Sequence, residues 1–255
     1  MSGDRKVTYE VERGIARVGL NRPERRNALD QELLSELRDA LRAASVDDSV
    51  RVVLVTGAGK DFCSGMDLRT FANDASGDLS KFQAEARNMA GLLLDMRCHP
   101  RPIVAAVHGR ALGGGCGIAT AADLVLAADS AQFGYPEIAI GFVPAIVMAI
   151  LRRSVSEKRA FEMITSGEAI SAQTALEYGM INRVFGADGF ERQVEEFVTN
   201  LAAKSTSGLM LAKELFYRTD AMQFEAAVEA GADVNALART TEDFKRGIEK
   251  FLKKT

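Results

Sequence analysis

The sequence is poor in the residues that bind metals or form disulfides. Among its 255 residues are only two histidines and three cysteines. The cysteines, Cys63, Cys98 and Cys116, form neither a CxxC pair nor a disulfide framework, so we expect free thiols in a reducing cytoplasm. With so few histidines and no paired cysteines, we expect no metal site.

Long apolar runs and a charge excess of one sign are also missing. No stretch of 18 apolar residues occurs, and the first residues, MSGDRKVTYEVERG, lack the apolar segment of a signal peptide. We therefore expect a cytoplasmic protein that does not enter a membrane. Lysine and arginine total 32 against 35 acidic residues, a net charge of −3. This balance argues against a nucleic-acid-binding surface, although a local basic pocket remains compatible with it.

The patterns that are present predict an α/β protein. Residues 7–20 alternate as in a β-hairpin, and the apolar runs 50–57, 102–109 and 123–129 are typical of strands buried on both faces. Residues 79–96 have the periodicity of a helix that connects two of these strands. From about residue 144 the chain becomes mainly helical, with one apolar stripe in residues 190–201 and another in 244–251. We predict an α/β core over residues 1–190 and a helical region over 191–255.

Two glycine-rich turns are the first candidates for chemistry. The segment HGRALGGGCGIATAADL (108–124) and the segment TGAGKDFCSGMDL (56–68) each follow a predicted buried strand. Glycine gives a ligand access to backbone N–H groups, and a helix N-terminus attracts negative charge. Two such turns could each aim one amide at the same oxyanion. Tight turns or close packing would explain the glycines equally well, and neither a Walker loop nor a dinucleotide-binding spacing is present after these strands.

Several segments together resemble the crotonase (enoyl-CoA hydratase/isomerase) superfamily, in order and in spacing. They are NRPERRNALD, GAGKDFCSGMDL, PIVAAVHGRALGGGCG, AQFGYPEIAIGFVP and SGEAISAQTALEYGMINRVF. The resemblance implies a spiral of ββα repeats with a helical C-terminal trimerisation region. It further implies an acyl-CoA thioester substrate, whose coenzyme A is part of the substrate, and no separate cofactor. The expected assembly is a homotrimer or a hexamer made of two trimers.

The same resemblance implies the site residues. The backbone N–H groups of Met66 and Gly114 would bind the thioester oxygen, and Glu137 would transfer the proton, which partial desolvation of its carboxylate would favour. Coenzyme A would be held around Arg26, Ala28, Ser64, Gly65, Asp67 and Leu68, with Arg22 and Arg25 as further cations near its phosphates. An apolar acyl pocket would include Phe142, Val143, Ile146 and Val147.

One position departs from the two-glutamate hydratases that the motifs resemble. Gly117 stands where those enzymes have a second glutamate, which helps to hold the attacking water. We predict an enoyl-CoA hydratase or dehydratase first and a Δ3-Δ2 enoyl-CoA isomerase as the alternative, since one glutamate is enough to move a proton between two carbons. Tyr135, Asp67 or Glu85 could hold a water instead. We favour simpler roles for them, in which Tyr135 lines the pocket, Asp67 fixes the turn and Glu85 is a solvated charge on a helix. A CoA-binding protein without catalysis is a third interpretation.

Overall fold

A twisted six-stranded sheet runs through the centre of the protein. The computed structural model describes residues 5–72 and 77–253. The strands of this sheet follow the order β1-β2-β3-β4-β6-β9, in which β1 and β2 form an antiparallel hairpin and all other neighbours are parallel. Their bounds are Val7–Glu12, Ile15–Leu20, Val52–Gly57, Ile103–Val107, Leu124–Ala128 and Arg183–Phe185. The predicted hairpin and the three predicted buried strands are confirmed.

A second, smaller sheet lies at the carboxyl ends of these strands. It has the order β5-β7-β8, with bounds Arg110–Leu112, Gln132–Gly134 and Ile170–Ser171. The chain therefore leaves a strand of the large sheet, adds a short extended segment to the second layer and then forms a helix, as in β4-β5-α4 and in β6-β7-α5. This repetition is a ββα spiral, and it puts the ends of successive turns side by side.

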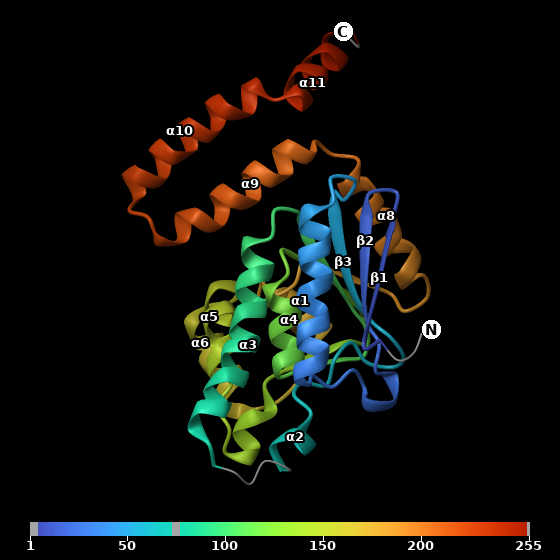
Figure 1. Cartoon of the computed structure of the whole chain (residues 1–255), viewed down its shortest axis with the longest axis vertical. Coiled ribbons are helices and arrows are strands. Elements are labelled where there is room, and N and C mark those ends of the chain that lie inside the picture. The colour runs from blue at the N-terminus through green and yellow to red at the C-terminus, as the bar shows by residue number, and fades with distance from the viewer. Residues whose placement is uncertain (1–4, 73–76, 254–255) are drawn as a thin grey trace.

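Helices cover both faces of the large sheet (Figure 1). Leucines of α1, together with α3 and α4, pack on one face, and Phe190, Val194 and Val198 of α8 pack on the other. The Asp30 side chain caps α1 by accepting a hydrogen bond from the Leu33 N–H at 2.8 Å. The bounds of the helices within the core are α1 Gln31–Val46, α2 Leu68–Ala72, α3 Leu79–Cys98, α4 Gly114–Ala121, α5 Ala145–Ser154, α6 Glu157–Ser166, α7 Ala172–Glu177 and α8 Phe190–Ala202, with 3-10 turns η1 Pro23–Arg25 and η2 Pro136–Ile140.

The last three helices extend away from this body. They are α9 (Thr206–Arg218), α10 (Phe224–Thr240) and α11 (Glu242–Leu252), with the 3-10 turn η3 (Thr219–Ala221) after α9. Figure 1 shows them stacked beyond one end of the sheet, with α9 next to the body and α10 and α11 on its far side. The helix α8, which begins at the predicted division near residue 190, packs against the sheet and not against this arm.

A buried ionic network attaches α9 to the core. The Lys213 ammonium donates to Asp123 Oδ2 at 2.8 Å and to the carbonyl oxygens of Met96 and Arg101 at 3.0 and 3.1 Å. The Tyr217 hydroxyl donates to the other Asp123 oxygen at 2.6 Å. Burial lowers the pKa of Lys213, while the neighbouring Asp123 carboxylate opposes that change. The network holds the base of the arm in place.

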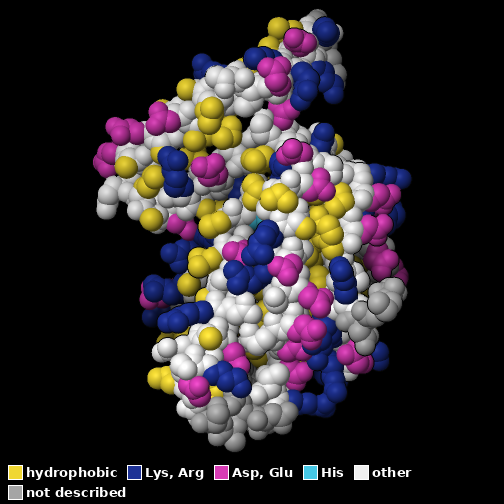
Figure 2. Space-filling view, viewed as in Figure 1, with side chains coloured by type: hydrophobic (Ala, Val, Ile, Leu, Met, Phe, Trp, Pro, Cys, Tyr) yellow, Lys and Arg dark blue, Asp and Glu magenta, His cyan; other side chains and the backbone are white. Residues whose placement is uncertain are grey.

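The outer part of the arm exposes large apolar side chains. Hydrophobic atoms appear along α9 and α10 in the space-filling view, on the part of the molecule that projects beyond the core (Figure 2). Phe224 is 78% exposed and Phe251 66%, and they belong to a set that also includes Phe216, Val228, Leu237, Phe244, Ile248 and Leu252. Within the described chain, no helix has the length and apolar character required to span a bilayer.

Candidate active site

The two glycine-rich turns of the sequence meet in the structure. Gly65 adopts φ +92°, and a Cβ there would lie only 2.9 Å from the Leu112 carbonyl oxygen. Cys63 and Leu112 join the two segments, because the Leu112 N–H donates to the Cys63 carbonyl at 2.9 Å. Glycine is required at Gly65 for both its backbone conformation and this close approach. The parallel strands β3 and β4 end at the same edge of the sheet, which brings these turns together.

The Met66 and Gly114 amides have the environment of an anion site. Leu29 bonds to the residues on either side of Met66, donating to Gly65 and accepting from Asp67 at 2.8 Å each, so the Met66 N–H points away from this bridge. Gly114 is the first residue of α4, where the N–H has no partner within the helix. Neither amide has a protein acceptor in residues 5–72 and 77–253. A Cβ at Gly114 would lie 3.9 Å from Met66 Cγ, so the two amides belong to one site.

Glu137 faces the same turn. It lies in η2, directly after β7, and a Cβ built on Gly113 would lie 2.6 Å from Glu137 Oε1. Glu137 Oε2 is buried and, among the described residues, has no hydrogen-bond partner. Burial raises the pKa of the Glu137 carboxyl above its ordinary value, because desolvation disfavours the charged form. A carboxylate with one unpartnered oxygen beside two free amides is suited to exchanging a proton with a bound molecule.

Gly117 has a packing role that its sequence position does not reveal. A Cβ at this residue would lie 2.2 Å from Val147 Cγ1 and 3.1 Å from Val147 Cβ. The helices α4 and α5 therefore cross in close contact at Gly117, and a methyl group of Val147 fills the space that a longer side chain would need. The place of a second carboxylate is occupied by hydrocarbon.

Two cavities meet at Met66. The first, of about 630 Å³, is largely apolar and includes Met66, Gly114 and Glu137 at one end. The second, of about 340 Å³, is open and polar; its walls comprise Arg25, Arg26, Ala28, Ser64, Met66, Asp67, Leu68 and Arg69, with Glu24 at the edge. The structure thus brings together five of the six residues predicted to contact coenzyme A, and the sixth, Gly65, shapes the turn between them. Three guanidinium groups make this second cavity suitable for phosphates.

Some of the other candidates have structural roles. The Arg22 guanidinium donates to the Ala28 carbonyl at 2.6 Å and pairs with Asp30 at 3.1 Å and Asp67 at 3.3 Å, so it braces the turn and is only slightly exposed. The Tyr135 ring is fully buried and its hydroxyl contacts the Thr120 hydroxyl, so the expectation that it lines the pocket is wrong.

The structure also tests the residues predicted for the acyl pocket and shows the environment of the cysteines. Phe142, Ile146 and Val147 line the apolar cavity as predicted, whereas Val143 does not. Burial raises the pKa of the Cys63 and Cys116 thiols to about 12, which makes them unreactive apolar residues.

Several residues of the site were missed from the sequence. Leu79, Phe82, Ala86 and Met89 line the apolar cavity from one face of α3, and Arg69 from α2 lines the polar one. The spacing of three or four residues between the α3 positions was a visible signal of one helical face. What the sequence could not show is that this face turns towards Glu137.

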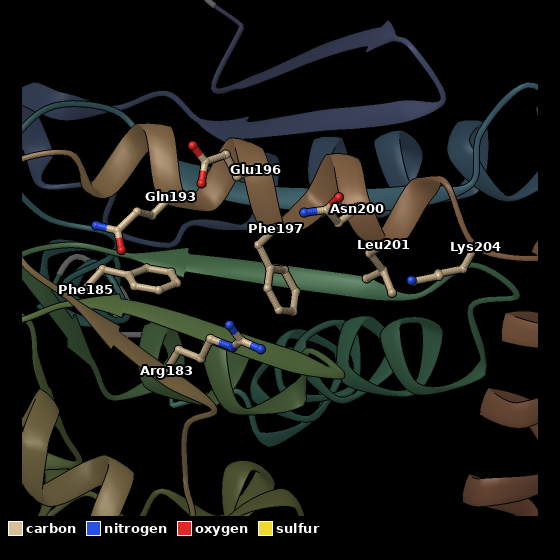
Figure 3. Close-up of a pocket in the computed structure, with 8 residues that line it drawn as sticks. All are labelled: Arg183, Phe185, Gln193, Glu196, Phe197, Asn200, Leu201 and Lys204. Atoms are coloured by element: carbon tan, nitrogen blue, oxygen red, sulfur yellow. The ribbon is translucent and has the colours of Figure 1, made fainter.

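A further groove, of about 370 Å³, lies on the opposite side of the large sheet, between α8 and the edge strand β9 (Figure 3). In Figure 3 Arg183 lies below the ring of Phe197, with its guanidinium carbon 5.0 Å from the ring centre. Lys204 lies at the end of the groove opposite Phe185. The sheet separates this groove from Glu137 and the glycine turns. Glu196, the carboxylate among the residues that line it, is exposed, so we do not assign the active site to this groove.

Known proteins share the fold and much of the sequence. The Enoyl-CoA hydratase/isomerase family profile matches residues 10–255. Over 92% of this chain, the sequence is 35% identical to 2,3-dehydroadipyl-CoA hydratase of Escherichia coli, covering 91% of that protein. It is 30% identical to 1,2-epoxyphenylacetyl-CoA isomerase of the same organism, over 97% of this chain and 95% of the relative.

Among solved structures, the enoyl-CoA hydratase of Mycobacterium smegmatis superposes with a TM-score of 0.94 at 30% identity, covering 98% of this chain and 97% of the other. Human enoyl-CoA hydratase domain-containing protein 3 superposes with a TM-score of 0.93 at 26% identity, with 98% of each chain covered. The α/β spiral with C-terminal helices predicted from the sequence motifs is therefore confirmed.

Proposed function

Since this chain belongs to the enoyl-CoA hydratase/isomerase (crotonase) family, we propose that it is an acyl-CoA enzyme that forms the enolate of an enoyl-CoA thioester and moves a proton with Glu137. The observation that carries the proposal is the meeting of two free amides, Met66 and Gly114, with the Glu137 carboxyl group, whose Oε2 is buried and has no hydrogen-bond partner among the described residues. A bound molecule would supply the hydrogen-bond partner that each amide and Glu137 Oε2 lack.

In the proposed complex each of the two cavities holds one part of the substrate. The phosphates of coenzyme A bind near Arg25, Arg26 and Arg69, and the acyl chain enters the apolar cavity. The thioester lies at Met66, where the cavities meet. Its carbonyl oxygen accepts hydrogen bonds from the Met66 and Gly114 N–H groups, which stabilise the negative charge of the enolate. Losing one such donor costs about 3–4 kcal/mol in a well-studied protease.

The reaction that this geometry supports best is isomerisation of a 3-enoyl-CoA to a 2-enoyl-CoA. Glu137 removes a proton from the α carbon, and the electron pair moves onto the carbonyl oxygen. When the enolate collapses, the double bond moves into conjugation, and the proton returns from Glu137 to the γ carbon. No second carboxylate and no water are needed, in agreement with the filled space between Gly117 and Val147.

Hydration or dehydration of the 2,3 double bond is the second candidate. The names of relatives such as 2,3-dehydroadipyl-CoA hydratase support it. It requires Glu137 and another group to hold one water, and Glu85 is the other carboxylate that lines the same cavity. Because Val147 fills the space beside Gly117, we rank isomerisation above hydration. The sequence alone predicted the opposite order.

A paired assay tests the proposal. Purified protein receives a 2-enoyl-CoA or a 3-enoyl-CoA of equal chain length, and absorbance of the conjugated thioester is followed together with chromatography of the products. A gain of conjugation from the 3-enoyl substrate alone supports isomerisation. Loss of conjugation with formation of a 3-hydroxyacyl-CoA establishes hydration instead. Binding of both thioesters without turnover would favour the non-catalytic interpretation.

We further propose that α9 to α11 join copies of this chain into a trimer, alone or as half of a hexamer. The apolar side chains exposed on the arm, such as Phe224 and Phe251, support self-association, because such large apolar surfaces on a projecting element are usually covered by a partner. Light scattering after size-exclusion chromatography measures the mass directly. A monomer at micromolar concentration would contradict this assignment.

The three free cysteines fit a reducing compartment such as the cytoplasm.

A further inference from the structure

The apolar cavity extends along one face of α3. Met89 lies at the catalytic end, where a Cβ at Gly114 would be 3.6 Å from its methyl group. Leu79, at the start of the helix, lines the other end. Ten residues separate them, and a helix rises about 1.5 Å per residue, so the cavity runs for about 15 Å beside α3. It is long enough for an extended acyl chain of many carbons.

Charge in this cavity has one sign only. Of the sixteen residues that line it, only Gln83, Glu85 and Glu137 have polar side chains, and no lysine, arginine or histidine of the described chain is among them. Glu85 is half-buried, and its carboxylate forms no ion pair or hydrogen bond with another described residue. All the cations of the site lie in the other cavity, at the proposed coenzyme A end.

The far end of the cavity has an apolar rim. Leu79 is 67% exposed, Phe82 37%, Ile140 61% and Phe142 47%, whereas Met89 and Val147 at the catalytic end are buried. These four side chains come from α3 and from the segment after β7, and all four line the cavity. An apolar chain that leaves the catalytic end would cover this rim and remove its surface from water.

We propose that this cavity selects uncharged, apolar acyl chains and that Glu85 excludes chains that end in a carboxylate. The inference rests on the proposed function, because it takes the ligand to be an acyl-CoA. A terminal carboxylate would meet the like charge of Glu85 in a cavity that offers no cation. Repulsion between two partly desolvated carboxylates a few ångströms apart is strong enough to weaken binding about tenfold or more.

Binding of saturated thioesters tests the proposal without turnover. The probes are hexanoyl-CoA and the CoA monothioester of the six-carbon dicarboxylic acid, with Kd measured by isothermal titration calorimetry. Glu85 lies four residues, or about 6 Å, from Met89 along α3, and a six-carbon chain spans a similar length. We expect hexanoyl-CoA to bind at least tenfold more tightly. Glu85→Gln should reduce this ratio at least threefold by strengthening binding of the charged chain, and Glu85→Lys should reduce it further. Glu191→Gln, an exposed change on α8, should leave the ratio unchanged.

The outcomes separate the two proposals. Equal Kd values for the two thioesters in the wild-type protein would overturn the selectivity and leave the acyl-CoA function standing. A ratio that Glu85→Gln and Glu85→Lys leave unchanged would overturn the role of Glu85. Failure of both thioesters to bind would overturn the proposed function and the inference with it. A circular dichroism spectrum for each variant ensures that the proteins compared are folded.

Discussion

Val147 and Gly117 pack so closely that Val147 Cγ1 lies 2.2 Å from the position of a Cβ at residue 117. The glycine therefore lets α4 and α5 approach each other, and the valine takes the space that a side chain at residue 117 would occupy. A carboxylate cannot simply be added here, since the helices would have to separate first. One contact between two helices thus bears on which reaction the site performs.

The first prediction concerns this contact. Gly117→Glu should destabilise the protein by about 1–3 kcal/mol, because overpacking a close helix contact forces side chains and backbone to move. Gly117→Glu combined with Val147→Ala should recover part of that loss and should hydrate a 2-enoyl-CoA faster than the wild-type protein. Urea unfolding and the hydration assay measure the two effects. If the single variant is as stable as wild type, the packing argument is wrong.

The second prediction concerns Glu137. Glu137→Gln should lower kcat by a factor of about 10²–10⁴, the usual contribution of general acid–base catalysis. The Kd of a saturated acyl-CoA should change less than about threefold, since the carboxylate acts on the proton and not on coenzyme A. Glu191→Gln serves as the control for loss of one negative charge. Full activity of Glu137→Gln would remove this residue from the mechanism.

The pH dependence of the reaction follows from the raised pKa of Glu137. Glu137 must be ionised to accept the α proton, so kcat/KM for the 3-enoyl substrate should fall as the pH drops through its pKa. Because burial raises that pKa, this acid limb should lie above pH 4.5, the ordinary value for a glutamate. A pH–rate profile measures it, with circular dichroism at each pH. A rate that stays flat down to pH 4.5 in folded protein would contradict the assignment.

The fourth prediction tests the position of the carboxylate. Gly113 has φ +53°, and a Cβ there would lie 2.6 Å from Glu137 Oε1. Gly113→Ala should therefore displace Glu137 and lower kcat at least tenfold, since small misplacements of catalytic groups are costly. Gly77→Ala is a control for a side chain at a positive φ, because Gly77 has φ +64° and open space around a Cβ. Both variants place a Cβ on a residue with positive φ, and only the first should lose activity.

The fifth prediction addresses the attachment of the arm. Lys213→Met should destabilise the protein by about 3 kcal/mol, because it leaves Asp123 charged in a largely buried place without its cation. The double change Lys213→Met and Asp123→Asn should be less destabilising than the sum of the two single changes, since the pair is then removed together. Chemical unfolding of the wild-type protein, the two single variants and the double variant gives the coupling free energy between Lys213 and Asp123. If the double variant loses as much stability as the two single variants together, the two residues do not stabilise each other.

The sequence by itself determined the elements and their order. Alternation in residues 7–20 and the buried apolar runs after residue 50 are local patterns, and local backbone preferences and burial were enough to interpret them. The motifs then predicted the spiral fold, and they selected Glu137, Met66 and Gly114, which the structure places in one site.

Only the tertiary structure decided what surrounds those groups. Tyr135 belongs to the core and not to the pocket, Arg22 braces a turn, and Glu85 joins Glu137 in one cavity although 52 positions separate them in the sequence. The contact of Gly117 with Val147 was likewise visible only in the tertiary structure. Such relations depend on how helices cross and on which face of α3 turns inward, and packing between elements distant in the chain sets both.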